Sequence, residues 1–161
     1  MSRPLIAKNG NDKIYTPVEL AKKIVANFKL EGVVLEPCKG TGAFYTAFPS
    51  YIKKEWCEID AGKDFFDFQG KVDWVITNPP YSQFRKFLQH SMEVADNVVF
   101  LCLINALWMK ARLRDIEKAE FGIKEIILIE TPETWPKFGL QVGVIYLKRK
   151  WSGDIKLLHI N

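Results

Sequence analysis

The chain has 161 residues, of which 48% are hydrophobic and 26% are charged, and its formal net charge is +4. This length and composition are typical of one globular domain and argue against a disordered or fibrous protein. No signal peptide is expected, and Asn105 interrupts the longest apolar run, so the sequence predicts a cytoplasmic protein without a membrane span. The three cysteines and two histidines lack the close spacing of a metal site, so we expect no metal.

An amphipathic helix is predicted directly after Tyr15. Thr16 is expected to be its N-cap and Pro17 its first helical residue, and apolar residues at four-residue spacing continue to Phe28. A capped helix N-terminus that follows an aromatic residue can also hold a carboxylate. The segment is therefore a candidate ligand contact as well as a helix start.

The first predicted strand ends at Glu36 and is followed by two closely spaced glycines, Gly40 and Gly42. A strand, a glycine loop and a helix in this order are typical of a nucleotide-type cofactor site at the carboxyl edge of a doubly wound sheet. A dinucleotide fingerprint requires a third glycine at position 45, which is Tyr45. The sequence therefore disfavours a nicotinamide-dependent dehydrogenase.

Glu58 lies near the end of the second predicted strand, about twenty residues after the glycine loop, where an acidic residue can accept hydrogen bonds from ribose hydroxyls. In the next segment acidic and aromatic residues alternate, as expected of a loop around an adenine ring. Asp64 with Phe65 is a better candidate there than Asp67 with Phe68. The aromatic residues are equally compatible with the core.

A run of β-forming residues ends abruptly at Asn78-Pro79-Pro80-Tyr81. The prolines donate no backbone N–H, and Asn78 precedes a proline and so avoids the helical region. The turn therefore presents acceptors: the side-chain oxygen of Asn78 and a carbonyl at Asn78 or Pro79 can face both hydrogens of one amino group. Tyr81 can stack on a flat substrate. The alternative is an ordinary strand-to-helix connection.

The rest of the chain continues to alternate between strands and helices. Helices are predicted over residues 84–95 and 106–120, and strands over residues 97–105, 123–130, 139–149 and, as a short addition, 154–160. The strands at 123–130 and 139–149 are expected to form an antiparallel pair. The sequence thus predicts an α/β domain with a mostly parallel sheet.

These segments together resemble the catalytic domain of S-adenosylmethionine-dependent amino-methyltransferases, and most specifically the gamma-type adenine-N6 DNA methyltransferases. The resemblance runs from Tyr15 to Arg149 and rests on the Tyr-Thr-Pro segment, the Glu-Pro-x-x-Gly-x-Gly-x-Phe loop, the two acidic positions and the Asn-Pro-Pro-Tyr turn. It implies a Rossmann-like class I fold: a single domain over residues 1–161, a mostly parallel seven-stranded sheet with an antiparallel C-terminal strand, and helices on both faces.

The resemblance implies S-adenosylmethionine as the cofactor. Its methionine part is expected at the start of the first helix and in the glycine loop, its ribose on Glu58 and its adenine beside Asp64 and Phe65. The expected cofactor contacts are Tyr15, Thr16, Pro17, Glu36, Pro37, Gly40, Gly42, Phe44, Glu58, Ile59, Asp64, Phe65 and Asn78.

In the family, acceptors in the Asn-Pro-Pro-Tyr turn draw the target amino group into a pyramidal geometry and stabilise the positive charge that develops on it, without a general base. An aromatic residue before the final hairpin, often followed by proline, stacks on the extruded base together with the tyrosine of the turn. Trp135, which precedes Pro136, matches that spacing best, and Phe138 is the alternative.

The substrate remains open at this point. Residues 42–78 leave no room for an inserted target-recognition domain, and twelve residues follow Arg149. We therefore expect low sequence specificity, a homodimer or a separate specificity subunit. DNA is the favoured substrate; an RNA base or a protein glutamine amide would use the same chemistry, and a non-catalytic S-adenosylmethionine-binding subunit is the alternative of a different class.

Overall fold

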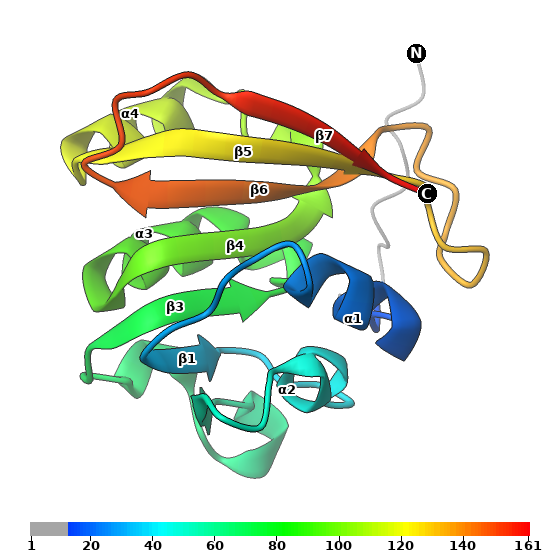
Figure 1. The fold of residues 1–161 in the computed structure, drawn as a ribbon, viewed down its shortest axis with the longest axis vertical. Coiled ribbons are helices and arrows are strands. Elements are labelled where there is room, and N and C mark those ends of the chain that lie inside the picture. Colours follow the sequence, from blue (N-terminus) through cyan, green and yellow to red (C-terminus); the bar gives the residue numbers. More distant parts are fainter. Residues whose placement is uncertain (1–12) are drawn as a thin grey trace.

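Residues 13–161 are described in the computed structural model, and they form one seven-stranded sheet (Figure 1). The strands are β1 (Val33–Glu36), β2 (Lys53–Trp56), β3 (Val72–Thr77), β4 (Ala95–Leu103), β5 (Phe121–Ile129), β6 (Val142–Arg149) and β7 (Lys156–Ile160). Their order across the sheet is β2-β1-β3-β4-β6-β5-β7. Among these strands only β6 runs antiparallel to its neighbours, β4 and β5.

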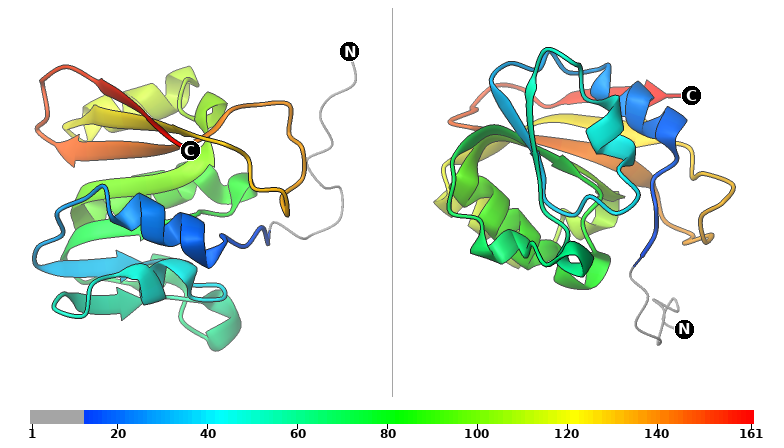
Figure 2. Two further views of the ribbon diagram at one scale, coloured as in Figure 1. Left: turned by 45° about the vertical axis from the view of Figure 1, so that its right-hand side comes forward. Right: turned by 90° about the horizontal axis from the view of Figure 1, so that it is seen from below.

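Helices cover both faces of the sheet (Figure 2). The α-helices are α1 (Val18–Val25), α2 (Ala43–Ala47), α3 (Phe84–Val94) and α4 (Lys110–Lys118), and the 3-10 turns are η1 (Ile59–Ala61), η2 (Phe65–Asp67), η3 (Tyr81–Gln83) and η4 (Ile104–Ala106). The helices α1 and α2 pack on one face, and α3 and α4 pack on the other. None of the helices in residues 13–161 has the length and apolar character that a membrane span requires.

The core has two layers because the central strands are buried on both faces. In β3, Val75 packs toward α3, whereas Trp74 and Ile76 pack toward α1. In β4, Val98 packs on the face covered by α3, and Val99 packs on the face covered by α1. This explains why the sequence of β4 is continuously apolar rather than alternating, as expected for the middle of a covered sheet.

The chain order creates a topological switch point at the carboxyl edge of the sheet. From β1 the chain passes outward to β2 and then returns to β3 on the other side of β1. Ligands bind at such a switch point, outside the carboxyl ends of the strands. The loop 130–141, orange in Figure 1, projects from this same carboxyl edge.

The predicted fold class is confirmed, including the antiparallel pair and the short strand near the C-terminus. The bounds of two predicted helices were wrong. Thr16 is not a helix cap: Pro17 is the N-cap residue, and α1 ends at Val25 rather than at Phe28. The predicted helix at 106–120 is divided into η4 and the shorter α4. Of the expected single domain, residues 1–12 lie outside the described part.

Candidate functional site

The candidate site lies where β1 and β3 end side by side. Glu36 is the last residue of β1, and Asn78 follows β3 directly. The two strands pair in parallel, with Leu35 opposite Val75, so both polar residues emerge at the same edge of the sheet. The glycine loop and the Asn-Pro-Pro-Tyr turn are therefore neighbours in space, as the sequence indicated.

Glu36 is a buried carboxyl group with no cationic partner within residues 13–161. Its side chain is 2% exposed, and its Oε2 accepts a hydrogen bond of 2.7 Å from the backbone N–H of Tyr45. No ion pair among the described residues involves Glu36. Burial raises the pKa of this carboxyl to about 8. A cationic ligand at the end of β1 would stabilise the ionised form and lower that pKa.

The glycine loop has a backbone that only glycine adopts readily. Gly40 has φ of +53° and Gly42 has φ of +84°, both in the left-handed region. A Cβ on Gly40 would lie 3.2 Å from the ring of Tyr15. The Tyr15 ring therefore lies against the loop, which joins the N-terminal segment to the expected cofactor site.

Glu58 holds the glycine loop in place. Its Oε2 accepts a hydrogen bond of 2.7 Å from the N–H of Gly40, and its Oε1 accepts one of 3.2 Å from the N–H of Asp60. A carboxylate has about four lone-pair sites, so both oxygens can still accept from ribose hydroxyls. The neighbouring side chain of Ile59 is exposed and can cover a flat ring.

The other expected cofactor contacts divide between open and buried positions. Asp64 accepts a hydrogen bond of 2.9 Å from the N–H of Phe66 through Oδ1, and among residues 13–161 no hydrogen bond to its Oδ2 is found. Phe65 is in the core, with its ring centre 5.2 Å from that of Phe87, and Phe44 and Pro37 are also buried. The rings of Phe65 and Phe44 therefore support the loops from inside.

The side chain of Asn78 is held by the N-terminal segment. Its Nδ2 donates to the carbonyl of Ile14 at 2.9 Å and to Oγ1 of Thr16 at 3.3 Å. Because the nitrogen is directed to these two acceptors, Oδ1 is at the other end of the amide, as an acceptor for a substrate. The Thr16 hydroxyl that was expected to cap α1 serves this link instead, which explains the displaced helix start.

Cys38 contacts the acceptor turn, a contact that the sequence did not predict. Its Sγ lies 3.0 Å from Oγ1 of Thr77 and donates to the carbonyl of Asn78 at 3.3 Å. Burial raises the pKa of this thiol to about 12, so it keeps its proton and remains a donor. With the Asn78 carbonyl engaged, the carbonyl of Pro79 is the better backbone acceptor for a substrate amino group.

Tyr81 and Phe138 face each other beyond the turn. Their ring centres are 5.9 Å apart at an interplanar angle of 66°. The Tyr81 hydroxyl is buried and has no hydrogen-bond partner among the described residues. Burial also raises the pKa of this phenol above its usual range. The loop 130–141 thus brings an aromatic ring to the turn.

Trp135, the preferred stacking residue from the sequence, lies in the core. It is 5% exposed, packs in the layer beneath α1, and donates its indole N–H to the carbonyl of Tyr15 at 2.8 Å. In this position the ring supports the loop and does not face a substrate. The sequence showed a tryptophan on a proline-rich loop, but not whether the loop folds inward.

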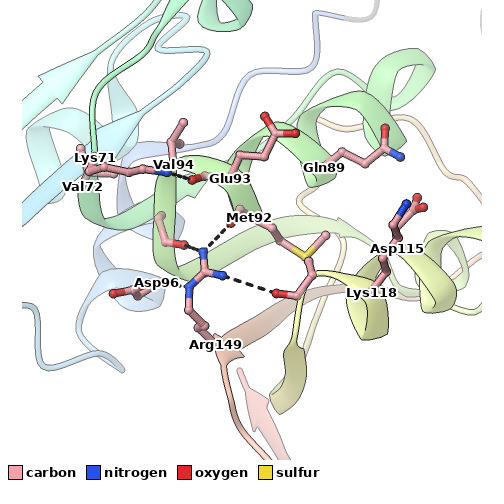
Figure 3. A pocket seen from close by; sticks show the side chains of 12 residues that line it. Lys71, Val72, Gln89, Met92, Glu93, Val94, Asp96, Asp115, Lys118 and Arg149 are labelled. Carbon is pink, nitrogen blue, oxygen red and sulfur yellow. Dashed lines mark hydrogen bonds and ion pairs between the residues drawn. The ribbon is translucent and has the colours of Figure 1, made fainter.

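A pocket of about 900 Å³ lies at the opposite edge of the sheet (Figure 3). Its central cation, Arg149, donates to the carbonyls of Met92 and Ala95 at 2.6 and 3.1 Å, and to Asp96 at 2.6 Å. These bonds provide donors for backbone carbonyls at the C-terminal end of α3, so Arg149 has a structural role. No group of three or more potential metal ligands occurs within residues 13–161.

No family model and no curated protein sequence match this chain. Its fold is similar to that of a Listeria monocytogenes protein described as a candidate class I S-adenosylmethionine-dependent methyltransferase, with 14% identity, a TM-score of 0.72, and coverage of 96% of this chain and 68% of that chain. It is also similar to the methyltransferase subunit of a type I restriction-modification system from Streptococcus thermophilus, with 17% identity, a TM-score of 0.69, and coverage of 90% and 47%.

A third similar structure is the tRNA m1G37 methyltransferase of M. jannaschii, with 14% identity, a TM-score of 0.65, and coverage of 86% of this chain and 50% of that chain. The chain therefore spans about half the length of the type I subunit and of the tRNA enzyme. At these identities the likeness is one of fold. The chain has a Rossmann-like class I methyltransferase fold.

Proposed function

We propose that this protein transfers a methyl group from S-adenosylmethionine to an exocyclic amino group, with N6 of adenine in DNA as the favoured target. The observation that carries the proposal is the position of Glu36 and Asn78 at adjacent strand ends: Glu36 is buried and has no ion-pair partner in the described part of the chain, and Asn78 begins an acceptor turn. The first suits a cationic cofactor, and the second suits an amino group.

The residues of the β1 and β2 loops fit the cofactor. Glu36 has an acidic, desolvated carboxyl for a cation, and the Tyr15 ring lies against the glycine loop at Gly40. Glu58 and Asp64 retain oxygens that can accept from ribose hydroxyls and from an adenine amino group, and Ile59 can cover the adenine. When bound, the cofactor supplies an electrophilic methyl group.

The turn after β3 prepares the nucleophile. The lone pair of an aromatic amine is delocalised into its ring, which makes the nitrogen a poor nucleophile. Oδ1 of Asn78 and the carbonyl of Pro79 accept the two N–H groups, favour a pyramidal nitrogen and stabilise its developing positive charge. The links from Nδ2 of Asn78 to Ile14 and Thr16 fix the acceptor before the substrate arrives, so little reorganisation is needed.

A base within a duplex must leave the stack to reach this turn. Tyr81 and Phe138 lie beside the turn and can replace the lost stacking, in the role that the sequence assigned to Tyr81 and Trp135. The similarity of fold to a methyltransferase subunit of a type I restriction-modification system supports a nucleic-acid substrate and assembly with other subunits. A separate specificity subunit or a homodimer is the assembly that we propose.

The test is incubation with labelled S-adenosylmethionine and, separately, unmethylated DNA, RNA and protein, followed by mass spectrometry of nucleosides and peptides. We expect N6-methyladenine in DNA. Bases methylated on an exocyclic amino group in RNA would replace DNA by RNA as the substrate, methylglutamine would replace the nucleic-acid substrate by protein, and no transfer to any of the three would favour a non-catalytic binding subunit.

The Asn78→Ala variant tests the site itself. Removing an acceptor that stabilises transition-state charge should lower kcat at least about 100-fold. Cofactor affinity, measured by calorimetry, should fall less than about tenfold because Glu36 remains. Asn27→Ala, at the opposite edge of the sheet, is the matched control and should keep both. An equal loss of turnover and cofactor affinity in Asn78→Ala would contradict the assignment.

A further inference from the structure

An exposed tryptophan lies on the rim of the candidate site. Trp108 is 49% exposed and the adjacent Met109 is 58% exposed, whereas the other described tryptophans are buried or half-buried. Both follow η4, which continues from the carboxyl end of β4. A large exposed apolar pair of this kind marks an interaction site more often than an isolated surface residue does.

This segment is held rigidly. Leu107 is fully buried, and the N–H of Ile104 donates to the carbonyl of Gln141 at 2.9 Å. The guanidinium of Arg112 donates to the carbonyl of Ala106 from the first turn of α4. The indole is therefore presented on a fixed support, at a low cost in conformational entropy on binding.

The segment is also close to the acceptor turn. β4 pairs in parallel with β3, with Phe100 opposite Thr77, so the residues that follow the two strands emerge together. The guanidinium of Arg112 lies 4.9 Å from the ring centre of Phe84, which is the residue directly after the turn that contains Tyr81. A substrate that delivers a base to the turn would pass over this rim.

Two exposed cations, Lys110 and Arg114, accompany the indole. Lys110 and Arg114 are four residues apart on α4, so they share one face, and both are exposed. Neither takes part in an ion pair among the described residues, and the nearby Asp115 is paired with Arg85 at 2.6 Å. An exposed π face beside unpaired cations is complementary to stacked bases on a phosphate backbone.

We propose that Trp108, Met109, Lys110 and Arg114 form a docking surface for the DNA that carries the target base. Lys110 and Arg114 contact backbone phosphates, and Trp108 stacks on a base next to the one that is flipped out. The inference rests on the proposed function for its substrate, but the surface is tested by binding rather than by turnover.

The first experiment measures the anisotropy of a labelled DNA duplex as salt is varied. Neutralising two phosphate contacts in Lys110→Gln/Arg114→Gln should reduce the slope of log K against log salt by about 2. The matched control, Lys53→Gln/Lys156→Gln, removes the same charge at the opposite edge and should leave the slope unchanged. An equal change of the slope in both double variants would overturn the proposed docking surface, because it would reflect the net charge alone.

The second experiment removes the indole. Trp108→Ala should weaken duplex binding about 5- to 150-fold, the range that one stacked base provides. The control is Tyr51→Ala, another exposed aromatic residue, before β2 and far along the sheet from the rim. Both variants should keep the wild-type urea midpoint, since neither side chain is in the core. Unchanged binding in Trp108→Ala would overturn the stacking role.

The outcomes of these experiments distinguish a failure of the docking surface from a failure of the proposed methyl transfer. Loss of DNA binding in the rim variants alone would support the surface even if the wild type methylates nothing. Methylation of DNA with the same KM in the wild type and the rim variants would overturn the surface and leave the proposed function intact. A wild type that binds duplex RNA but not DNA, or neither, would also overturn it.

Discussion

The buried carboxyl of Glu36 makes folding stability depend on pH, and Glu36→Gln isolates that dependence. The amide oxygen of glutamine can still accept the hydrogen bond from the N–H of Tyr45, whereas the negative charge is lost. In the wild type, burial raises the pKa from 4.5 to about 8. The folded state therefore binds more protons than the unfolded state between these two values, so stability falls as the pH rises through that window.

The magnitude follows from the pKa. At pH 5 the folded wild type is already neutral at this position, as the variant is. Raising the pH to 9 ionises the buried group and should destabilise the wild type relative to Glu36→Gln by about 4 kcal/mol, at about 1.4 kcal/mol for each pH unit between 5 and 8. Packing differences between the two side chains are present at both pH values and cancel.

The assay is urea unfolding of both proteins, without cofactor, at pH 5, 7 and 9. A difference in free energy of unfolding that stays flat across this range would refute the argument, because it would mean that Glu36 is ionised at no cost in the fold. A difference that grows as the pH falls would have the wrong sign and would refute it equally.

Cofactor binding should also depend on the ionisation of Glu36. If a cationic cofactor requires the ionised carboxyl, its affinity for the wild type should rise about tenfold per pH unit below 8, and binding at pH 7 should release about 0.9 proton. Calorimetry in two buffers of different ionisation enthalpy measures that proton. Glu36→Gln should bind more weakly and release none, whereas proton release by the variant would assign the titration to another residue.

The remaining predictions concern the loop 130–141 and the support of β3. Phe138→Ala should raise the KM for the base-bearing substrate about 5- to 150-fold without changing cofactor affinity, and an unchanged KM would remove its stacking role. Trp135→Phe should instead lower the free energy of unfolding by about 0.5–1.5 kcal/mol, since the hydrogen bond from the indole N–H to the carbonyl of Tyr15 is lost; weaker substrate binding at unchanged stability would contradict this. Gly32→Ala should destabilise by more than about 2 kcal/mol in urea unfolding, because φ is +79° and the new Cβ would lie 1.9 Å from Oδ2 of Asp73.

The sequence predicted the fold well because its local signals agree with the tertiary arrangement. The apolar run of β4 matches a strand covered on both faces, and the glycines after β1 have the left-handed backbone that their residue type favours. The boundaries were less certain where a side chain has two possible partners. Thr16 can cap a helix or accept from Asn78, and the sequence contains no information about which partner is nearer.

The site was predicted in part, for a related reason. Residue type and spacing brought Glu36, Glu58 and Asn78 to one edge, since strand order determines where strand ends meet. Exposure was not predictable in the same way. Trp135 and Trp108 both lie in loops, yet of these two only Trp135 is buried, because its indole packs in the core and bonds to the carbonyl of Tyr15, a residue 120 positions away in the sequence.

The two halves of the site share their supports, and this predicts coupled binding. The N–H of Gly40 donates to Glu58, and Cys38, two residues earlier in the same loop, donates to the carbonyl of Asn78. Asn78 in turn holds Thr16. The Nδ2 bonds of Asn78 fix its side chain in the free protein, whereas the Cys38 bond ties the backbone of the turn to the glycine loop. A ligand that orders the glycine loop therefore also restrains the backbone of the turn, and the second ligand has less backbone entropy to lose. Because coupling free energies are reciprocal, a substrate analogue should raise cofactor affinity by the same factor by which the cofactor raises analogue affinity. Cys38→Ala should reduce both factors equally, since its thiol is the link between the loop and the turn.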